Sequence, residues 1–347
     1  VRHMMNTPGY TNGDDYLINV HDYWLEVSRQ QLKMNTHVFG YYRAPHSISF
    51  YKNQSYSQNH QLVTDALNWM KDNNPDFDWD QLTLDDDGTV LGLNVIYPER
   101  IPGAGATHWF KNRFTAPNGV EMGTMAAQTL WDWWGEKQDL FTLLHEQGHM
   151  LFHWPDLYNV NSSSGTGKYE LMSSNNHWIG IPNASLLADA GWMDLTEATG
   201  SQTVTLTENG IYGMKVTNPN DPLEYFVIEA RNHNDLSGQR IPGSDRGLFI
   251  WHIDKNVGGN RTVDLKQGQH YGISLEQADG NNDLENNTNS GDDGDAFVEG
   301  DRFNDDSPAQ ARWWDGSRSG LDISNIQFSN DGKITFEDFK KIMEMEE

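Results

Sequence analysis

Two histidines and a glutamate between residues 145 and 149 have the types and spacing that catalysis by a metal ion requires. In a helix of about 3.6 residues per turn, His145 and His149 lie one above the other on one face, where two neutral imidazoles can bind one zinc ion. Glu146 is the next residue round the helix and is placed to contact the water on the metal. The segment therefore predicts a zinc site with an adjacent general base.

These groups suffice for the hydrolysis of an amide. Zinc lowers the pKa of its bound water from ~16 towards ~7, so Glu146 can take the proton at neutral pH. The metal also polarises the carbonyl group, and the protonated Glu146 can pass its proton to the leaving amine. These residues therefore predict hydrolysis of an amide bond.

A chance match is the alternative explanation, because the chain has 13 histidines in 347 residues. The surrounding residues Leu140 to Phe152 are mostly apolar and have helical spacing, so the motif is expected on a buried helix. Two buried histidines and a buried glutamate are costly without a metal or mutual pairing. The pattern therefore favours the metal site.

A catalytic zinc ion needs a third protein ligand and an open fourth position. Pro155 favours the end of the helix, because the residue before a proline avoids the helical conformation. Asp156 follows at once and is the first candidate for the third ligand. His153 is the second candidate, although a continuing helix would carry it away from the metal, and Glu170 is a more remote one.

The remaining sequence predicts an α+β fold. Residues 62–70 have helical spacing, and residues 91–97 form a buried strand pattern that Pro98 ends. From residue 202 onward, short β-branched and aromatic segments alternate with turns, which is typical of antiparallel sheets. The first four residues look like a cloning remnant. We therefore expect a catalytic domain over residues 5–195 and a β-rich, sandwich-like region over residues 196–347.

Further motifs lie on both sides of the histidine segment. They are Val20–Ser28, Phe39–Tyr42, Pro155–Tyr158, Tyr169–Ser174, Gly191–Trp192, Glu224–Arg231, Gly247–Asp254 and Gln277–Gly280. Together with the His-Glu-x-x-His segment they resemble the immune inhibitor A family of secreted bacterial zinc peptidases, within the metzincin group. The resemblance covers most of the chain.

The resemblance implies a metzincin-like fold, hydrolysis of internal peptide bonds with proteins or peptides as substrates, and an extracellular location. It also implies that His145, His149 and Asp156 are the zinc ligands, that Glu146 is the general base, and that Met172 forms the floor under the metal. The family usually has a glycine where the chain leaves the helix, and its aspartate comes one residue earlier. Here Phe152-His153 occupies that stretch. Glycine normally supplies a left-handed turn there, and histidine tolerates that conformation better than most residues.

Other polar segments give weaker signals. A polar side chain often follows the Met-turn of metzincins and stabilises the oxyanion, and the candidates are Asn175, Asn176 and His177. The aromatic cluster Trp131-Asp132-Trp133-Trp134 either lines a substrate cleft or packs in a core. Two acidic loops are candidate structural calcium sites, with solvated loops as the alternative. Their carboxylates are those of Asp85, Asp87, Asp293 and Asp295.

Composition excludes several classes of protein. The chain has 50 acidic and 24 basic residues, a net charge of −26, which argues against nucleic acid as a partner. It has no cysteine, which excludes disulfides, thiolate metal sites and cysteine nucleophiles. No apolar run approaches the length of a membrane span. Two alternatives to a peptidase stay open: a catalytically inactive exported binding module or adhesin, and a zinc hydrolase that acts on other bonds.

Overall fold

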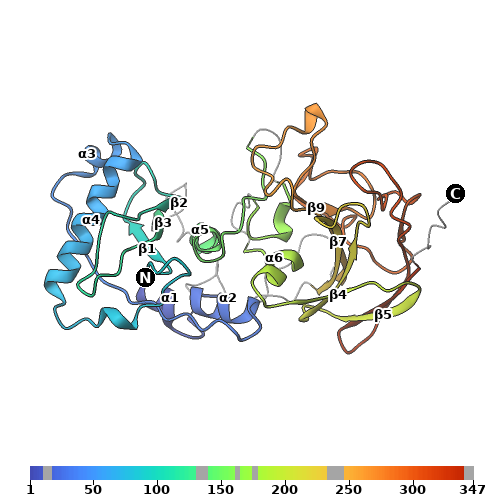
Figure 1. Cartoon of the computed structure of the whole chain (residues 1–347), viewed down its shortest axis with the longest axis horizontal. Coiled ribbons are helices and arrows are strands. Elements are labelled where there is room, and N and C mark those ends of the chain that lie inside the picture. Colours follow the sequence, from blue (N-terminus) through green and yellow to red (C-terminus); the bar gives the residue numbers. More distant parts are fainter. Residues whose placement is uncertain (11–17, 130–139, 161–164, 174–178, 233–245, 340–347) are drawn as a thin grey trace. The chain divides into compact units, whose positions relative to one another are not determined.

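The computed structural model describes residues 1–10, 18–129, 140–160, 165–173, 179–232 and 246–339 (Figure 1). Contacts within the chain divide it into two compact units. Unit 1 consists of Val1–Thr7 and Asn35–Trp154, and unit 2 consists of Pro8–Met34 and Pro155–Glu347. Among the described residues, no helix combines the length and the apolar character needed to cross a membrane.

Unit 1 contains a small mixed sheet and the helix that carries the histidines. Its helices are α1 (Arg2–Asn6), α3 (Ile48–Lys52), α4 (Tyr56–Asn73), the 3-10 helix η1 (Trp79–Gln81) and α5 (Leu140–Phe152). Its strands are β1 (Leu93–Tyr97), β2 (Ala106–Trp109) and β3 (Thr124–Thr129). They are arranged in the order β1-β3-β2, with β1 parallel and β2 antiparallel to β3. The predicted helix over residues 62–70 is confirmed within α4, and the predicted strand is confirmed as β1.

Local sequence explains the two main helices of unit 1. A capping box begins α4, because Ser55 accepts a hydrogen bond from the Gln58 amide and the Gln58 side chain accepts one from the Ser55 amide. Helix α5 contacts β2 and β3. It buries Leu140, Leu143, Leu144 and Met150 together with His145, Glu146 and Gln147 of the motif, and His149 is half-buried. The motif is therefore held in the interior of the unit, as its apolar surroundings predicted.

Unit 2 consists mainly of two sheets. Its helical segments are α2 (Val20–Val27), η2 (Gly167–Tyr169), α6 (Ala184–Asp189) and η4 (Leu265–Gln267). One sheet has the strand order β4-β6-β7-β8-β9 and the other has the order β10-β11-β12-β5. The strands are β4 (Asp194–Glu197), β5 (Gln202–Thr207), β6 (Tyr212–Thr217), β7 (Glu224–Asn232), β8 (Arg246–Asp254), β9 (Ile273–Glu276), β10 (Phe303–Asn304), β11 (Asp322–Phe328) and β12 (Lys333–Asp338).

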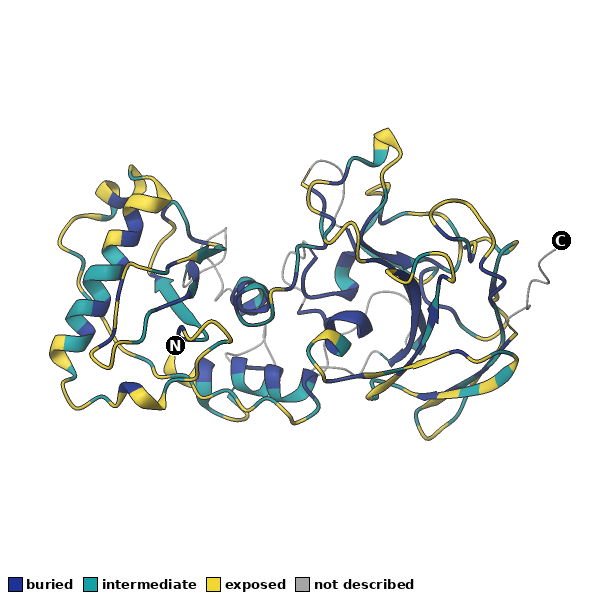
Figure 2. Ribbon diagram, viewed as in Figure 1, coloured by how far each residue is buried: buried dark blue, intermediate teal, exposed yellow. Residues whose placement is uncertain are grey.

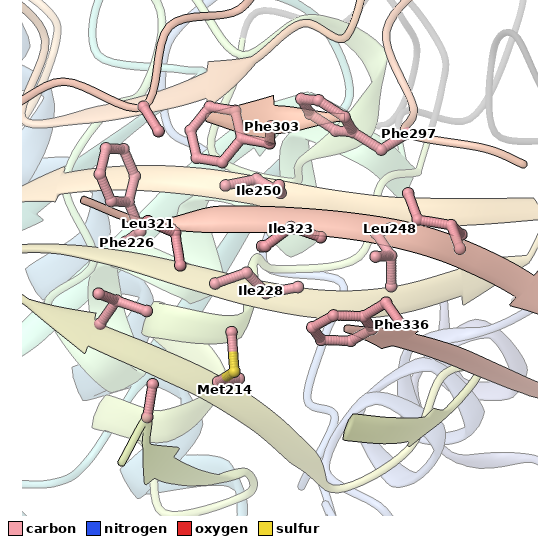
Figure 3. Packing of buried hydrophobic residues seen from close by; sticks show 14 of the residues in the cluster. Met214, Phe226, Ile228, Leu248, Ile250, Phe297, Phe303, Leu321, Ile323 and Phe336 are labelled. Carbon is pink, nitrogen blue, oxygen red and sulfur yellow. The ribbon is translucent and has the colours of Figure 1, made fainter. Parts of the chain in front are cut away.

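The two sheets of unit 2 share one apolar core (Figure 3). Ile228 of β7 and Ile250 of β8 come from the first sheet, and Ile323 of β11 and Phe336 of β12 come from the second. Strands β7 and β8 are buried at nearly every position because α6 also contacts them (Figure 2). The expected β-rich character of the chain after residue 196 is confirmed in the described strands.

The expected domain boundary after residue 195 falls inside β4, whereas the contacts divide the chain between Trp154 and Pro155. Helix α2, which the sequence placed with the catalytic domain, belongs to unit 2. The fully buried Tyr23 donates a hydrogen bond to the Gly180 carbonyl at 2.9 Å. Whether residues 5–195 fold as an independent domain stays a prediction.

Candidate metal centre

His145 and His149 stand together on α5, as the spacing predicted. Their Nε2 atoms are 3.2 Å apart, and their ring centroids are 4.8 Å apart with the rings nearly perpendicular. His145 is only 7% exposed. The rings thus direct one nitrogen each towards the same point, which is the arrangement that two histidine ligands of one ion require.

The proton on the ring of His149 is fixed by the end of the helix. Nδ1 of His149 donates a hydrogen bond of 2.5 Å to the carbonyl oxygen of Trp154. A neutral imidazole with its proton on Nδ1 keeps a lone pair on Nε2. A backbone carbonyl in this role orients metal-binding histidines in many proteins. Nε2 of His149 is therefore the atom available to a metal.

His153 makes the turn that brings Trp154 back to His149. Its φ angle is +56°, in the left-handed region, and its amide donates to the His149 carbonyl at 3.2 Å. Such a bond is typical of a helix that ends with a residue in the left-handed conformation. Glycine usually takes that position. The prediction that histidine tolerates this turn is confirmed. The side chain of His153 is exposed and does not join the two ring nitrogens.

Asp156 completes a set of three candidate ligands. One ligand atom from each of His145, His149 and Asp156 lies within 4.8 Å of the others. All three side chains belong to one continuous segment, so local chain geometry sets their spacing. Two imidazole nitrogens and one carboxylate oxygen are donors that zinc accepts, and three protein ligands are typical of catalytic zinc sites. The residues present therefore fit a zinc ion.

Glu146 is held by a neighbouring strand. It is 6% exposed, and its Oε2 atom accepts a hydrogen bond of 2.7 Å from Oγ1 of Thr107 in β2. Gln147, the next residue, donates to Oδ1 of Asn94 in β1 at 3.1 Å. The sequence analysis did not identify Thr107, because a threonine in a short strand carries no signal of its own. A carboxylate with a fixed rotamer beside three candidate ligands can act as a base on water bound there.

Met172 is fully buried in the segment that resembles a Met-turn. Its carbonyl accepts a hydrogen bond of 2.7 Å from the Leu157 amide, so the turn is attached to the residue after Asp156. Its amide donates to Oε2 of Glu170 at 2.5 Å. Burial raises the pKa of Glu170 to about 8. Glu170 thus holds the turn and is not part of the ligand set, while the position of Met172 under a metal stays a prediction.

The other candidate residues divide into two groups. Asn175, Asn176, His177 and the Trp131–Trp134 cluster lie outside the described residues. The described calcium candidates have other partners: Asp85 accepts from Thr89, Asp87 pairs with Lys111 at 2.9 Å, and Asp295 accepts from Tyr169 at 2.6 Å. Within the described part of the chain, neither acidic loop supplies a set of three clustered ligands. Calcium at Asp85, Asp87, Asp293 and Asp295 stays a prediction.

Comparison with protein families, with curated proteins and with solved structures finds no match for this chain. The class of the site is therefore argued from its own geometry. The geometry shows a His-His-Asp group that could hold a metal ion, at and just after the end of a helix that also carries a hydrogen-bonded carboxylate. The resemblance to the immune inhibitor A family stays a prediction.

Proposed function

We propose that this chain is a zinc-dependent endopeptidase that uses a metal-activated water to hydrolyse internal peptide bonds. The observation that carries the proposal is the convergence of His145, His149 and Asp156, and Glu146 on the same helix as the two histidines is held by Thr107. The Nε2 atoms of the buried His145 and the half-buried His149 lie 3.2 Å apart, so one ion can be bound by both rings. The carboxylate of Asp156 would supply the third ligand atom.

Each residue has a distinct part in the proposed reaction. His145, His149 and Asp156 would hold the ion, which when bound lowers the pKa of water and polarises a carbonyl group. Glu146 takes a proton from the attacking water and then donates it to the leaving amine. Thr107 keeps Glu146 in one rotamer during both transfers. The His149–Trp154 hydrogen bond keeps the ring of His149 in the tautomer that can bind the ion.

The sheet next to α5 supports action on internal bonds. Strand β2 lies at an edge of the described three-stranded sheet and carries Thr107. An extended peptide that pairs with an edge strand is held by main-chain hydrogen bonds along its length and not by its termini. Such binding would place the middle of a peptide beside Glu146. An extracellular location, which the resemblance implies, stays a prediction.

Metal analysis combined with a protease assay tests the proposal. We expect about one zinc ion per purified chain, cleavage of casein, loss of cleavage on dialysis against a chelator, and recovery when zinc is restored. A pure protein that carries no transition metal and resists reloading would contradict the proposal. Stoichiometric zinc without cleavage of any protein would instead support the inactive binding module, and binding of a hydroxamate peptide mimic separates a peptidase from other zinc hydrolases.

A further inference from the structure

Arg261 lies between β8 and β9 and is bonded to the third candidate ligand. Its Nη1 atom donates a hydrogen bond of 2.5 Å to Oδ2 of Asp156. The same atom donates to the hydroxyl of Tyr158, and the guanidinium lies over the Tyr158 ring, 5.4 Å from its centroid. Arg261 is 105 positions from Asp156 in the sequence and therefore holds the candidate ligand from a distant segment of the chain.

The backbone around Arg261 is fixed on both sides. The Asn260 amide donates to the Asp156 carbonyl at 2.9 Å, and the Val160 amide donates to the Arg261 carbonyl at 3.1 Å. Asn260 is fully buried, and its side chain donates to the Leu157 carbonyl at 3.2 Å. The segment that carries Arg261 thus runs beside residues 156–160 and is hydrogen-bonded to them.

Close packing adds to these bonds. A Cβ atom on Gly259 would lie 2.8 Å from Cβ of Pro155 and 3.0 Å from the Asp156 carbonyl oxygen. Only glycine permits so close an approach without a shift of the backbone. The Arg261–Asp156 pair therefore rests on an ordered scaffold, unlike most ion pairs on protein surfaces.

We propose that Arg261 is a positioning residue for Asp156 that raises the affinity of the site for its metal. The proposal rests on the zinc-dependent function proposed above. By engaging one carboxylate oxygen, Arg261 fixes the rotamer of Asp156 and favours ligation through a single oxygen. The entropy of ordering the carboxylate is then lost on folding of the chain and not on metal binding.

A guanidinium near a cation also repels it, so the two effects oppose each other. The Arg261 side chain is 55% exposed. Water screens a charge at such a position, which reduces the repulsion between the guanidinium and the ion. Loss of a group that orients a metal ligand typically weakens metal binding by ~10–100-fold. We therefore expect orientation to dominate.

The test compares Arg261→Gln and Arg261→Lys with the wild-type chain. The zinc dissociation constant is measured by competition with a chromogenic chelator, and the ligand geometry is followed by the visible absorption of the cobalt-substituted protein. Arg261→Gln should weaken zinc binding by ~10–100-fold and change the cobalt spectrum. Arg261→Lys retains a charged donor and should recover most of the affinity.

A matched control is available in unit 2. Arg302 pairs with Asp322, its side chain is 56% exposed, and its Nε donates to Oδ1 at 2.6 Å. Arg302→Gln removes a comparable ion pair and should leave zinc affinity and the cobalt spectrum unchanged. Thermal unfolding of the metal-free variants checks that each is folded.

The outcomes separate the two proposals. A wild-type chain that binds neither zinc nor cobalt would overturn the proposed function itself. A wild-type chain that binds both, with equal or tighter zinc binding in Arg261→Gln and an unchanged spectrum, would overturn only the role of Arg261. If Arg261→Lys bound zinc as weakly as Arg261→Gln, the role of Arg261 would also be overturned. Loss of the charged donor would then not be the cause of the weaker zinc binding.

Discussion

Thr107 donates a hydrogen bond from its hydroxyl to Glu146 across 2.7 Å, so a strand residue fixes the carboxylate that follows the first histidine. The same hydroxyl lies 2.9 Å from the main-chain carbonyl of Glu146. Strand β2 and helix α5 are both regular elements and contact each other. A base held between two such elements needs little reorganisation before it accepts a proton.

Glutamine at position 146 should abolish catalysis and leave the metal site intact. The Glu146→Gln side chain has nearly the same volume and retains an oxygen that can accept from Thr107, but it cannot take a proton from water. We expect casein hydrolysis to fall by at least ~10²-fold, the usual contribution of a general base. Zinc content and melting temperature should stay close to the wild-type values. Retained hydrolysis would remove Glu146 from the mechanism.

Valine at position 107 should lower kcat more than it raises KM. Thr107→Val keeps the shape of the side chain and removes the donor to Glu146. Loss of a partner from a buried acceptor costs about 1–3 kcal/mol in the free energy of unfolding. Steady-state kinetics and chemical denaturation measure the two effects, and Thr107→Ser, which keeps the hydroxyl, is the control. Wild-type kinetics in Thr107→Val would show that the hydrogen bond does not position the base.

Two substitutions distinguish the candidates for the third ligand. Asp156→Ala removes a member of the converging set and should weaken zinc binding by at least ~10-fold. His153→Gly should leave zinc binding unchanged and stabilise the chain by about 0.5–1 kcal/mol, because glycine adopts the positive φ of this turn without strain. Isothermal titration and denaturant unfolding test both results. The opposite order of zinc affinities would assign the third ligand to His153.

Stability should fall as pH rises through the titration of His252. This ring is 1% exposed and lies between Glu224 at 2.9 Å and Glu276 at 3.1 Å. Burial acts to lower the pKa of His252, but the hydrogen bonds to the two carboxylates outweigh it and raise the pKa. The pKa of histidine in the unfolded chain is about 6.5. Because the pKa of His252 is higher in the folded chain, its full contribution to the free energy of unfolding is present below about pH 6.5. That contribution is lost as the pH rises through the pKa of the folded chain.

The measurement for His252 is the melting temperature as a function of pH. The wild-type chain should lose more stability between about pH 6 and pH 9 than His252→Gln, whose side chain does not titrate. Glu170, with a pKa raised to about 8, contributes to the slope of both proteins equally, so only the difference reports on His252. Identical slopes in the two proteins would contradict the assignment.

The grouping of the three candidate ligands could be predicted because they are close together in the sequence. Helical periodicity puts His145 above His149, and the helix ends at Phe152, shortly before Pro155 and Asp156. The turn at His153, where the chain leaves the helix, also involves residues that are close in the sequence, because the His153 amide donates to the His149 carbonyl. The three side chains belong to residues 145–156, and one ligand atom from each lies within 4.8 Å of the others.

The groups that orient the site could not be predicted, because they come from other parts of the chain. Thr107 is 39 residues from Glu146, and Arg261 is 105 residues from Asp156. Their positions depend on how β2 meets α5 and on how the segment after β8 returns to residues 156–160. The placement of α2 in unit 2 could not be predicted for the same reason. Nothing in residues 20–27 indicates that Tyr23 donates a hydrogen bond to Gly180, 157 positions later.

The single short segment that carries all three ligands also bears on the order of folding. An ion bound by residues 145–156 would close a ring of about a dozen residues, and rings of about ten residues close within ~10–100 ns. Pairing of β5 with β12 joins residues more than a hundred positions apart and is expected to be far slower. Metal capture can therefore precede assembly of the sandwich, so zinc supplied during refolding should act on the early steps of the process.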